Sequence, residues 1–271
     1  MITEFYWINT GFTTGREWLT KGNYGLRRLI FPAYCGLLKD DQFGYILFDT
    51  GYGPFFQQAT KKWPYRLYRW ITPIHYNPDE DILAVMNRLG ITPADIKYLI
   101  LSHLHADHIG HLKSFPQAQI ICHEEVMKLF DLTPFKQTRH GFLPALVPTD
   151  FKSKVEILEN HQATRHPQFD YSWSLFDGCI EAVYLPGHAL GQIGIRFNFR
   201  DHALFLVADA SWFTSAIDDQ TYPNRLVSMI LPDWKAFKNT LANLHEFKRL
   251  NPDVMLIPTH CSERQVPNNL N

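Results

Sequence analysis

Four histidines and one aspartate lie within nine residues of the chain, as His103, His105, Asp107, His108 and His111. In an extended backbone, side chains two positions apart point the same way, so His103 and His105 can converge on one point. We expect Asp107 and His108 to turn into the start of a helix and to face a second point nearby. Imidazole and carboxylate groups are typical ligands of Zn²⁺ and similar divalent metals. The spacing therefore predicts a metal site, and the alternative is a solvated, histidine-rich loop.

Three further candidate ligands, His188, Asp209 and His260, each follow an apolar run that is typical of a strand. A side chain at the end of a strand lies on a loop that a rigid scaffold holds in place, as functional side chains often do. Taken singly, each is more typical of a cap or of the core, but together with the first cluster they predict one site. His111 comes about one helical turn after His108, and we expect a partly exposed helix residue there rather than a ligand.

The elements that must position these side chains alternate between short strands and helices, which indicates layered α/β packing in a single domain over residues 1–271. A hairpin is predicted at 33–38 and 45–49, with its turn at 39–41. Apolar residues at helical spacing predict helices over 79–89 and 234–250. Buried strands are predicted at 97–101, 119–122, 155–158, 180–184, 193–197, 203–207 and 254–257. The stretch 131–170 mixes prolines and phenylalanines without a constant period, so we expect an irregular insertion or lid.

The chain resembles the metallo-β-lactamase superfamily in a motif and in the order of three later residues, namely His103-x-His105-x-Asp107-His108, His188, Asp209 and His260. Segments 31–38, 46–51 and 184–188 look in particular like those of the N-acyl homoserine lactone hydrolases, the quorum-quenching lactonases. The resemblance implies a four-layer αβ/βα sandwich with metals at one edge, between the two sheets.

The resemblance also implies a role for each candidate ligand. One metal would be held by His103, His105 and His188 and the other by Asp107, His108 and His260, with Asp209 bridging the two. Asp49 would support the site by accepting a hydrogen bond from a ligand imidazole. We therefore expect two divalent metal ions per chain, with zinc as the expected metal.

Two such metals can hold a hydroxide and polarise a substrate carbonyl, which predicts hydrolysis of an ester or lactone by metal-bound hydroxide. Asp107 and Asp209 are the predicted catalytic residues, and Asp107 could carry a proton to the leaving group. A thioesterase or a β-lactamase-like hydrolase is the first alternative. A mononuclear iron dioxygenase of the persulfide type shares the histidine motif and is a second alternative from another class of enzyme.

The substrate is expected to be a small ester or lactone, and three side chains are predicted to contact it. Phe135 and Phe142, in the predicted lid, could shelter an apolar acyl chain. Trp212 stands where the lactonases typically carry a tyrosine whose hydroxyl contacts the substrate carbonyl. An indole N–H donates a hydrogen bond but accepts none, so this position is expected to alter substrate choice.

Other motifs support different chemistry less well. Asp49-Thr50-Gly51 is the triplet of aspartic proteases, but the chain has no second Asp-Thr-Gly or Asp-Ser-Gly to complete the carboxylate pair. The glycines around His188 lack the Lys-Ser/Thr of a phosphate-binding loop. The segment 63–70 interleaves bases with aromatics, a pattern that can bind single-stranded nucleic acid, but a packed aromatic segment near the mouth of the site is the favoured interpretation.

The composition of the chain limits the kinds of partner that it is expected to bind. With 26 basic and 27 acidic side chains, the formal net charge of −1 argues against a protein built mainly to coat nucleic acid or an anionic membrane. No apolar run reaches the ~18–20 residues that span a bilayer, and the N-terminus lacks the pattern of a secretory signal. The four cysteines form no C-x-x-C pair, as is typical of reduced thiols. We expect a cytoplasmic enzyme, monomeric or homodimeric, that binds no nucleic acid.

Overall fold

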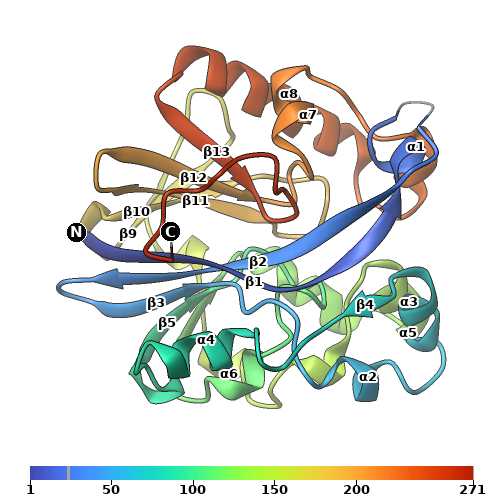
Figure 1. The fold of residues 1–271 in the computed structure, drawn as a ribbon, viewed down its shortest axis with the longest axis horizontal. Coiled ribbons are helices and arrows are strands. Elements are labelled where there is room, and N and C mark those ends of the chain that lie inside the picture. Colours follow the sequence, from blue (N-terminus) through green and yellow to red (C-terminus); the bar gives the residue numbers. More distant parts are fainter. Residues whose placement is uncertain (23–24, 271) are drawn as a thin grey trace.

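The computed structural model describes residues 1–22 and 25–270, which form two mixed β-sheets stacked face to face with helices on the outside (Figure 1). The first sheet has seven strands in the order β4 (Ile74–His75), β1 (Ile2–Arg16), β2 (Arg28–Asp40), β3 (Gly44–Phe48), β5 (Ile96–Ile100), β6 (Gln119–Cys122) and β7 (Val155–Ile157). The second has six, in the order β13 (Val254–Pro258), β12 (His202–Ala208), β11 (Ile193–Phe199), β10 (Ile180–Tyr184), β9 (Ser172–Leu175) and β8 (Ala163–Thr164).

Helices cover the outer face of each sheet. Against the first sheet lie α2 (Phe56–Ala59), α3 (Arg66–Ile71), α4 (Ile82–Arg88), α5 (Pro134–Arg139) and α6 (Phe151–Lys154). Against the second lie α7 (Thr214–Asp218) and α8 (Trp234–Leu250), while α1 (Glu17–Thr20) sits at the far end of the β1–β2 ribbon. The predicted four-layer αβ/βα sandwich is confirmed.

Alternation of side chains along the strands builds three cores. From β1, Phe5 and Trp7 face the second sheet, and the Phe5 ring contacts Phe197 edge-on at 5.1 Å. Their neighbours Tyr6 and Ile8 point to the other face and pack with the α4 side. Each fully buried aromatic or aliphatic side chain of this kind contributes about 1.5–3 kcal/mol to stability. The period-two pattern therefore fixes both faces of the first sheet at once.

The third core lies under α8, where Leu241, Leu244 and Phe247 pack on Phe205 and Val207 of β12. The predicted helix 234–250 is confirmed in full, and Asp233 caps it by accepting a hydrogen bond from the Ala236 N–H at 2.8 Å. Among residues 1–22 and 25–270, no helix has both the length and the apolar character needed to cross a membrane.

The predicted strands and the hairpin are present, but the fifteen-residue strand β1 had not been expected. Its polar and apolar residues do not alternate, because Phe5 to Ile8 are buried on both faces of the sheet. Two irregularities also shift its register against β2, between Ile2 and Glu4 and between Asn9 and Phe12. The segment 131–170 consists of short helices and two edge strands, β7 and β8, and contributes Leu146 and Phe151 to the core beside α4.

Candidate metal centre

The candidate ligands meet at one edge of the two sheets because the strands that precede them end there. The loop with the histidine motif follows β5, Asp49 follows the adjacent parallel strand β3, and Asp209 and His260 follow the parallel pair β12 and β13. The Ile193 N–H of β11 donates to the Ser102 carbonyl at 2.9 Å, so the second sheet also holds the start of this loop. The topology of the sheets therefore brings residues that are far apart in the sequence together in one cluster.

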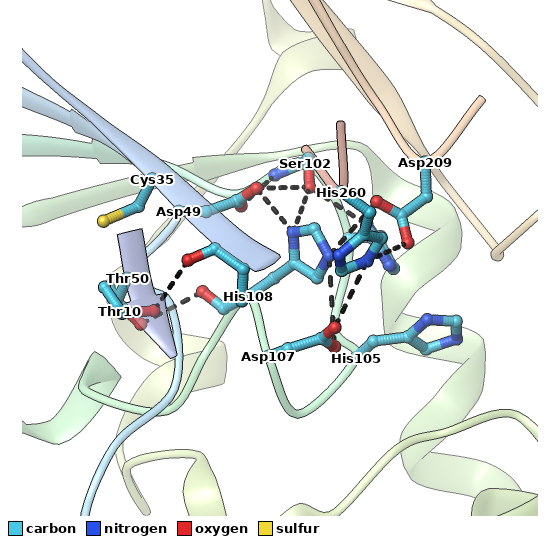
Figure 2. A network of polar contacts seen from close by, with 12 residues as sticks. Thr10, Cys35, Asp49, Thr50, Ser102, His105, Asp107, His108, Asp209 and His260 are labelled. Atoms are coloured by element: carbon cyan, nitrogen blue, oxygen red, sulfur yellow. Dashed lines mark hydrogen bonds and ion pairs between the residues drawn. The ribbon is translucent and has the colours of Figure 1, made fainter. Parts of the chain in front are cut away.

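Asp49 accepts several hydrogen bonds that fix the conformation of the loop with the histidine motif (Figure 2). Its carboxylate is fully buried and accepts from the Ser102 N–H at 2.8 Å, from the Ser102 hydroxyl at 2.7 Å and from His108 Nδ1 at 2.7 Å. Bonds to a charged acceptor are the strong ones in a low-dielectric site. Because Nδ1 of His108 carries the donated proton, Nε2 is the nitrogen that would release its proton and bind a metal, and it faces Asp209 in the cluster.

Potential metal-binding atoms gather in a first group of four residues. One donor atom from each residue lies within 4.8 Å of the others, in His103, His105, His188 and Asp209. His188 Nε2 is 3.1 Å from His105 Nδ1 and 3.2 Å from Asp209 Oδ2. Three imidazoles and a carboxylate at this spacing make a donor set that suits a zinc-like ion.

A second group, Asp107, His108 and His260, meets the same 4.8 Å criterion beside the first. His260 Nε2 lies 3.3 Å from Asp107 Oδ2 and 3.0 Å from Asp209 Oδ2, while His108 Nε2 lies 3.4 Å from Asp209 Oδ1. Asp209 therefore contacts histidines of both groups, which is the position that a bridging ligand requires. His260 is oriented from behind by a 2.7 Å hydrogen bond between its Nδ1 and the Pro32 carbonyl.

Several buried polar atoms of this cluster have no hydrogen-bond partner among the described residues, namely His103 Nε2, His108 Nε2, His188 Nδ1 and Asp209 Oδ1. An unpaired buried polar group costs about 1–3 kcal/mol, so four in one cluster are hard to reconcile with a purely structural role. Divalent cations would engage His103 Nε2, His108 Nε2 and Asp209 Oδ1 together, while His188 faces the first group through its Nε2. The residues present therefore fit a metal centre.

The pKa values of the histidines are shifted in different directions in the two groups. Burial lowers the pKa of His105 to about 4 and that of His188 to about 3, which keeps both imidazoles neutral, as a metal ligand must be. Burial alone would also lower the pKa of His108, but the carboxylates of Asp49, Asp209 and Asp107 outweigh it and raise that pKa well above its usual range. The negative charge that holds a proton at His108 is the charge that would attract a cation there.

Two glycines are required where the backbone approaches the cluster. Gly141 has φ +65°, and a Cβ at that position would lie 2.6 Å from Cδ2 of His105. Gly187 has φ +124°, and a Cβ there would lie 2.0 Å from the backbone nitrogen of Phe237 in α8. Both conformations disfavour any side chain, so these glycines allow the loops to close around the two histidines.

Two expectations about the histidine loop are wrong. Asp107 and His108 lie in turns rather than at the start of a helix, because Thr50 binds the His108 carbonyl through its N–H at 2.7 Å and its hydroxyl at 3.0 Å. His111 is not partly exposed: it is buried and its Nε2 lies 3.0 Å from Asp81 Oδ2, which itself caps α4. His111 therefore ties the loop to the first helical layer.

The three predicted substrate contacts lie in different settings. Trp212 is half-buried beside the cluster, with its ring 6.0 Å from that of His188, edge to face. Phe135 is exposed on α5 and its ring contacts Trp63. Phe142 is fully buried and packs on Phe130, so it has no surface to offer a substrate and belongs to the core instead.

Sequence reasoning missed Ser102, whose hydroxyl donates to Asp49 and lies 2.9 Å from His103 Nδ1. Its position directly before the first histidine of the motif was the available signal. The Pro32 carbonyl behind His260 had no such signal, since a backbone acceptor is not visible in residue types.

The model of the metallo-β-lactamase superfamily matches residues 29–218, a span that contains every candidate ligand except His260. The chain belongs to the metallo-β-lactamase superfamily. Among its relatives, N-acyl homoserine lactonase AiiB of Agrobacterium fabrum is 31% identical over 202 residues, which cover 74% of this chain and 70% of that protein. Membership in this superfamily implies the binding of divalent metal.

N-acyl homoserine lactonase AttM of Azorhizobium caulinodans is 29% identical over 159 residues. That match spans 56% of this chain and about half (55%) of AttM. A solved N-acyl homoserine lactone hydrolase with N-hexanoyl-L-homoserine at its catalytic metal centre has a TM-score of 0.74 and 17% identity, over 97% of this chain and 95% of that one. This likeness shows a shared fold across nearly the whole chain.

Proposed function

We propose that this protein is a metal-dependent hydrolase that opens a lactone ring of the N-acyl homoserine lactone type. The observation that carries the proposal is the pair of adjacent donor groups that share Asp209, with four buried polar atoms left without a hydrogen bond. The relatives named N-acyl homoserine lactonases support a cyclic ester as the substrate.

Two divalent ions, which we take to be zinc, would be held by the two donor groups. His103, His105 and His188 would hold one and Asp107, His108 and His260 the other, with Asp209 shared. When bound, such ions polarise a carbonyl and lower the pKa of water from 15.7 to about 7. The chain's own contribution is to surround the donors with carboxylates, to orient them through hydrogen bonds and to shield them from bulk water.

Asp107 is the residue proposed to handle the proton. Its carboxylate is nearly buried and lies 3.3 Å from His260 Nε2, so it stands beside both donor groups. There it can orient the attacking water and pass a proton to the alkoxide that leaves when the ring opens.

Trp212 is proposed to set substrate choice. Its ring stands over His188, and its indole N–H has no hydrogen-bond partner within residues 1–22 and 25–270, so it is free to donate to a substrate oxygen. Phe135 is the remaining candidate for contact with an acyl chain. We also propose that residues 1–271 act as one domain with 131–170 as a lid, and that the four unpaired cysteines reflect a cytoplasmic location.

The test is a hydrolysis panel with metal content measured on the same sample. The panel holds lactones of several acyl lengths, a thioester, a β-lactam and a phosphodiester. We expect lactone opening to exceed every other reaction in a sample that carries two zinc per chain. Faster thioester or β-lactam cleavage would move the assignment to those hydrolases, and one iron per chain with oxygen consumption would refute it.

A further inference from the structure

Acidic residues are absent from three separate segments of the chain, 51–78, 132–149 and 220–232. All 27 Asp and Glu residues lie outside them, while the three segments hold seven of the 26 Lys and Arg. The net charge of −1 for the whole chain therefore conceals a strong local segregation of charge.

The structure brings these segments together on one face. The ring of Trp63, just before α3, contacts that of Phe135 on α5 with centroids 5.7 Å apart. Arg139 at the end of α5 donates from Nε to the Met229 carbonyl of the 3₁₀ helix Arg225–Met229 at 3.0 Å. In Figure 1, α3 and α5 lie side by side at the lower right of the molecule.

Large apolar side chains project from this face into solvent. Six of them are between 53% and 74% exposed, namely Trp63, Trp70, Ile71, Phe135, Met229 and Ile230. Scattered exposed apolar residues are normal, but exposed apolar side chains gathered on elements that contact one another mark an interaction site.

The cations among them are not neutralised within the molecule. Lys61, Lys62, Arg66, Arg69, Lys136 and Arg139 form no ion pair with any residue in 1–22 or 25–270, whereas the Lys and Arg ion pairs of the structure lie elsewhere, as in Lys128–Glu125 and Arg196–Glu181. A face that combines exposed apolar groups with unpaired cations is complementary to a surface that is apolar beneath a layer of negative charge.

We propose that this face, the lipid-docking face, binds the surface of an anionic membrane. Tryptophan favours the boundary between headgroups and acyl chains, and lysine and arginine beside it attract anionic headgroups. Single-stranded nucleic acid fits less well, because Ile71, Met229 and Ile230 offer no flat ring on which a base could stack. A second copy of the chain would place like charges opposite one another.

Docking in this orientation brings lipid to the candidate metal centre. The lipid-docking face continues from α5 directly into Gly141, whose backbone packs against His105. On the other side, Val227 of the 3₁₀ helix packs in one cluster with Trp212. The proposed site therefore lies between the two halves of this face, where an acylated substrate dissolved in the membrane reaches it.

The experiment is sedimentation of the zinc-loaded full chain with phosphatidylcholine vesicles in which about one-third of the lipid is anionic phosphatidylglycerol. We expect binding that high salt abolishes and that pure phosphatidylcholine vesicles do not reproduce. The double variant Lys62→Glu/Trp70→Ser should bind at least about thirtyfold more weakly, since each basic residue near the surface contributes about 1 kcal/mol and the substitution reverses one charge. The matched control Lys97→Glu/Leu250→Ser, at the opposite end of the strands, should bind like the original chain.

Four outcomes overturn the proposal. They are no vesicle binding by the folded original chain, equal loss in the control variant, tighter binding to single-stranded RNA than to anionic vesicles, and a dimer in solution that the Lys62→Glu/Trp70→Ser variant dissociates. Vesicle binding is measured without any substrate, so its failure leaves the proposed hydrolase activity untouched and the reverse also holds.

Discussion

Replacement of Asp49 by asparagine tests how the metal centre is held, because the substitution keeps the size of the side chain and removes only its charge and one acceptor. The carboxylate now accepts three hydrogen bonds, two on Oδ2 and one on Oδ1. The introduced amide can accept through its oxygen alone. If the amide oxygen stays with the Ser102 N–H, its nitrogen faces His108 Nδ1, and the proton of that imidazole must move to Nε2, the atom that faces Asp209.

The expected magnitude follows from those bonds. Loss of two charge-assisted hydrogen bonds, each contributing about 1.5–3 kcal/mol, predicts a fall of about 3–6 kcal/mol in the free energy of unfolding. A proton on His108 Nε2 would also prevent that nitrogen from binding a metal. Loss of a hydrogen bond behind a metal ligand typically weakens metal binding about 10- to 100-fold. Urea unfolding measures the first effect, and zinc competition against a chromophoric chelator measures the second.

Asp40→Asn is the matched control. Asp40 is also buried and accepts hydrogen bonds from the backbone N–H groups of Gln42 and Phe43. It is the last residue of strand β2, at the end of that strand away from the metal centre. We expect it to lose stability while its zinc affinity stays unchanged. Equal zinc affinity in Asp49→Asn and the original chain, or equal loss in both variants, would refute the reasoning.

Four further predictions follow from the same geometry. His105→Ala should lose one equivalent of bound metal and all lactone hydrolysis, and full activity would contradict its place in the first group. Trp212→Tyr should raise turnover of homoserine lactones relative to other esters, whereas an unchanged ratio would exclude this residue from substrate choice. Gly187→Ala should lower the free energy of unfolding by about 3 kcal/mol in urea titration, because its Cβ collides with the Phe237 backbone. Chelation should lower the melting temperature by about 5–10 °C, and re-addition of zinc should restore it, since ligand at 100 times its Kd stabilises by about 2.7 kcal/mol.

Local patterns in the sequence predicted layered α/β packing and one cluster of candidate ligands, whereas the four-layer sandwich and the division of the ligands between two metals came from the resemblance to the superfamily. Clear apolar patterns mark strands 119–122 and 180–184 and the helix 234–250. A polar residue that directly follows such a strand can be placed at the edge of the sheet where that strand ends. β1 was missed because Phe5 to Ile8 are buried on both faces of the sheet and therefore show no alternation of polar and apolar types.

The errors at the site concern tertiary contacts. Phe142 looks like a pocket residue in sequence, but it pairs with His105 in a β-bridge and packs into the core. His111 looks like a surface residue until Asp81, thirty positions earlier, is brought beside it. The lipid-docking face was hidden in the same way, because α3, α5 and the 3₁₀ helix meet only in the folded chain.

The central claim is that two adjacent donor groups sharing Asp209 bind two metal ions that open a lactone. Zinc titration of the metal-free chain, followed by hydrolysis of an N-acyl homoserine lactone, tests it most directly. We predict that activity rises with added zinc and reaches its plateau at two equivalents per chain. Full lactone hydrolysis by the metal-free chain, or a zinc-saturated chain that opens no lactone, would contradict the account.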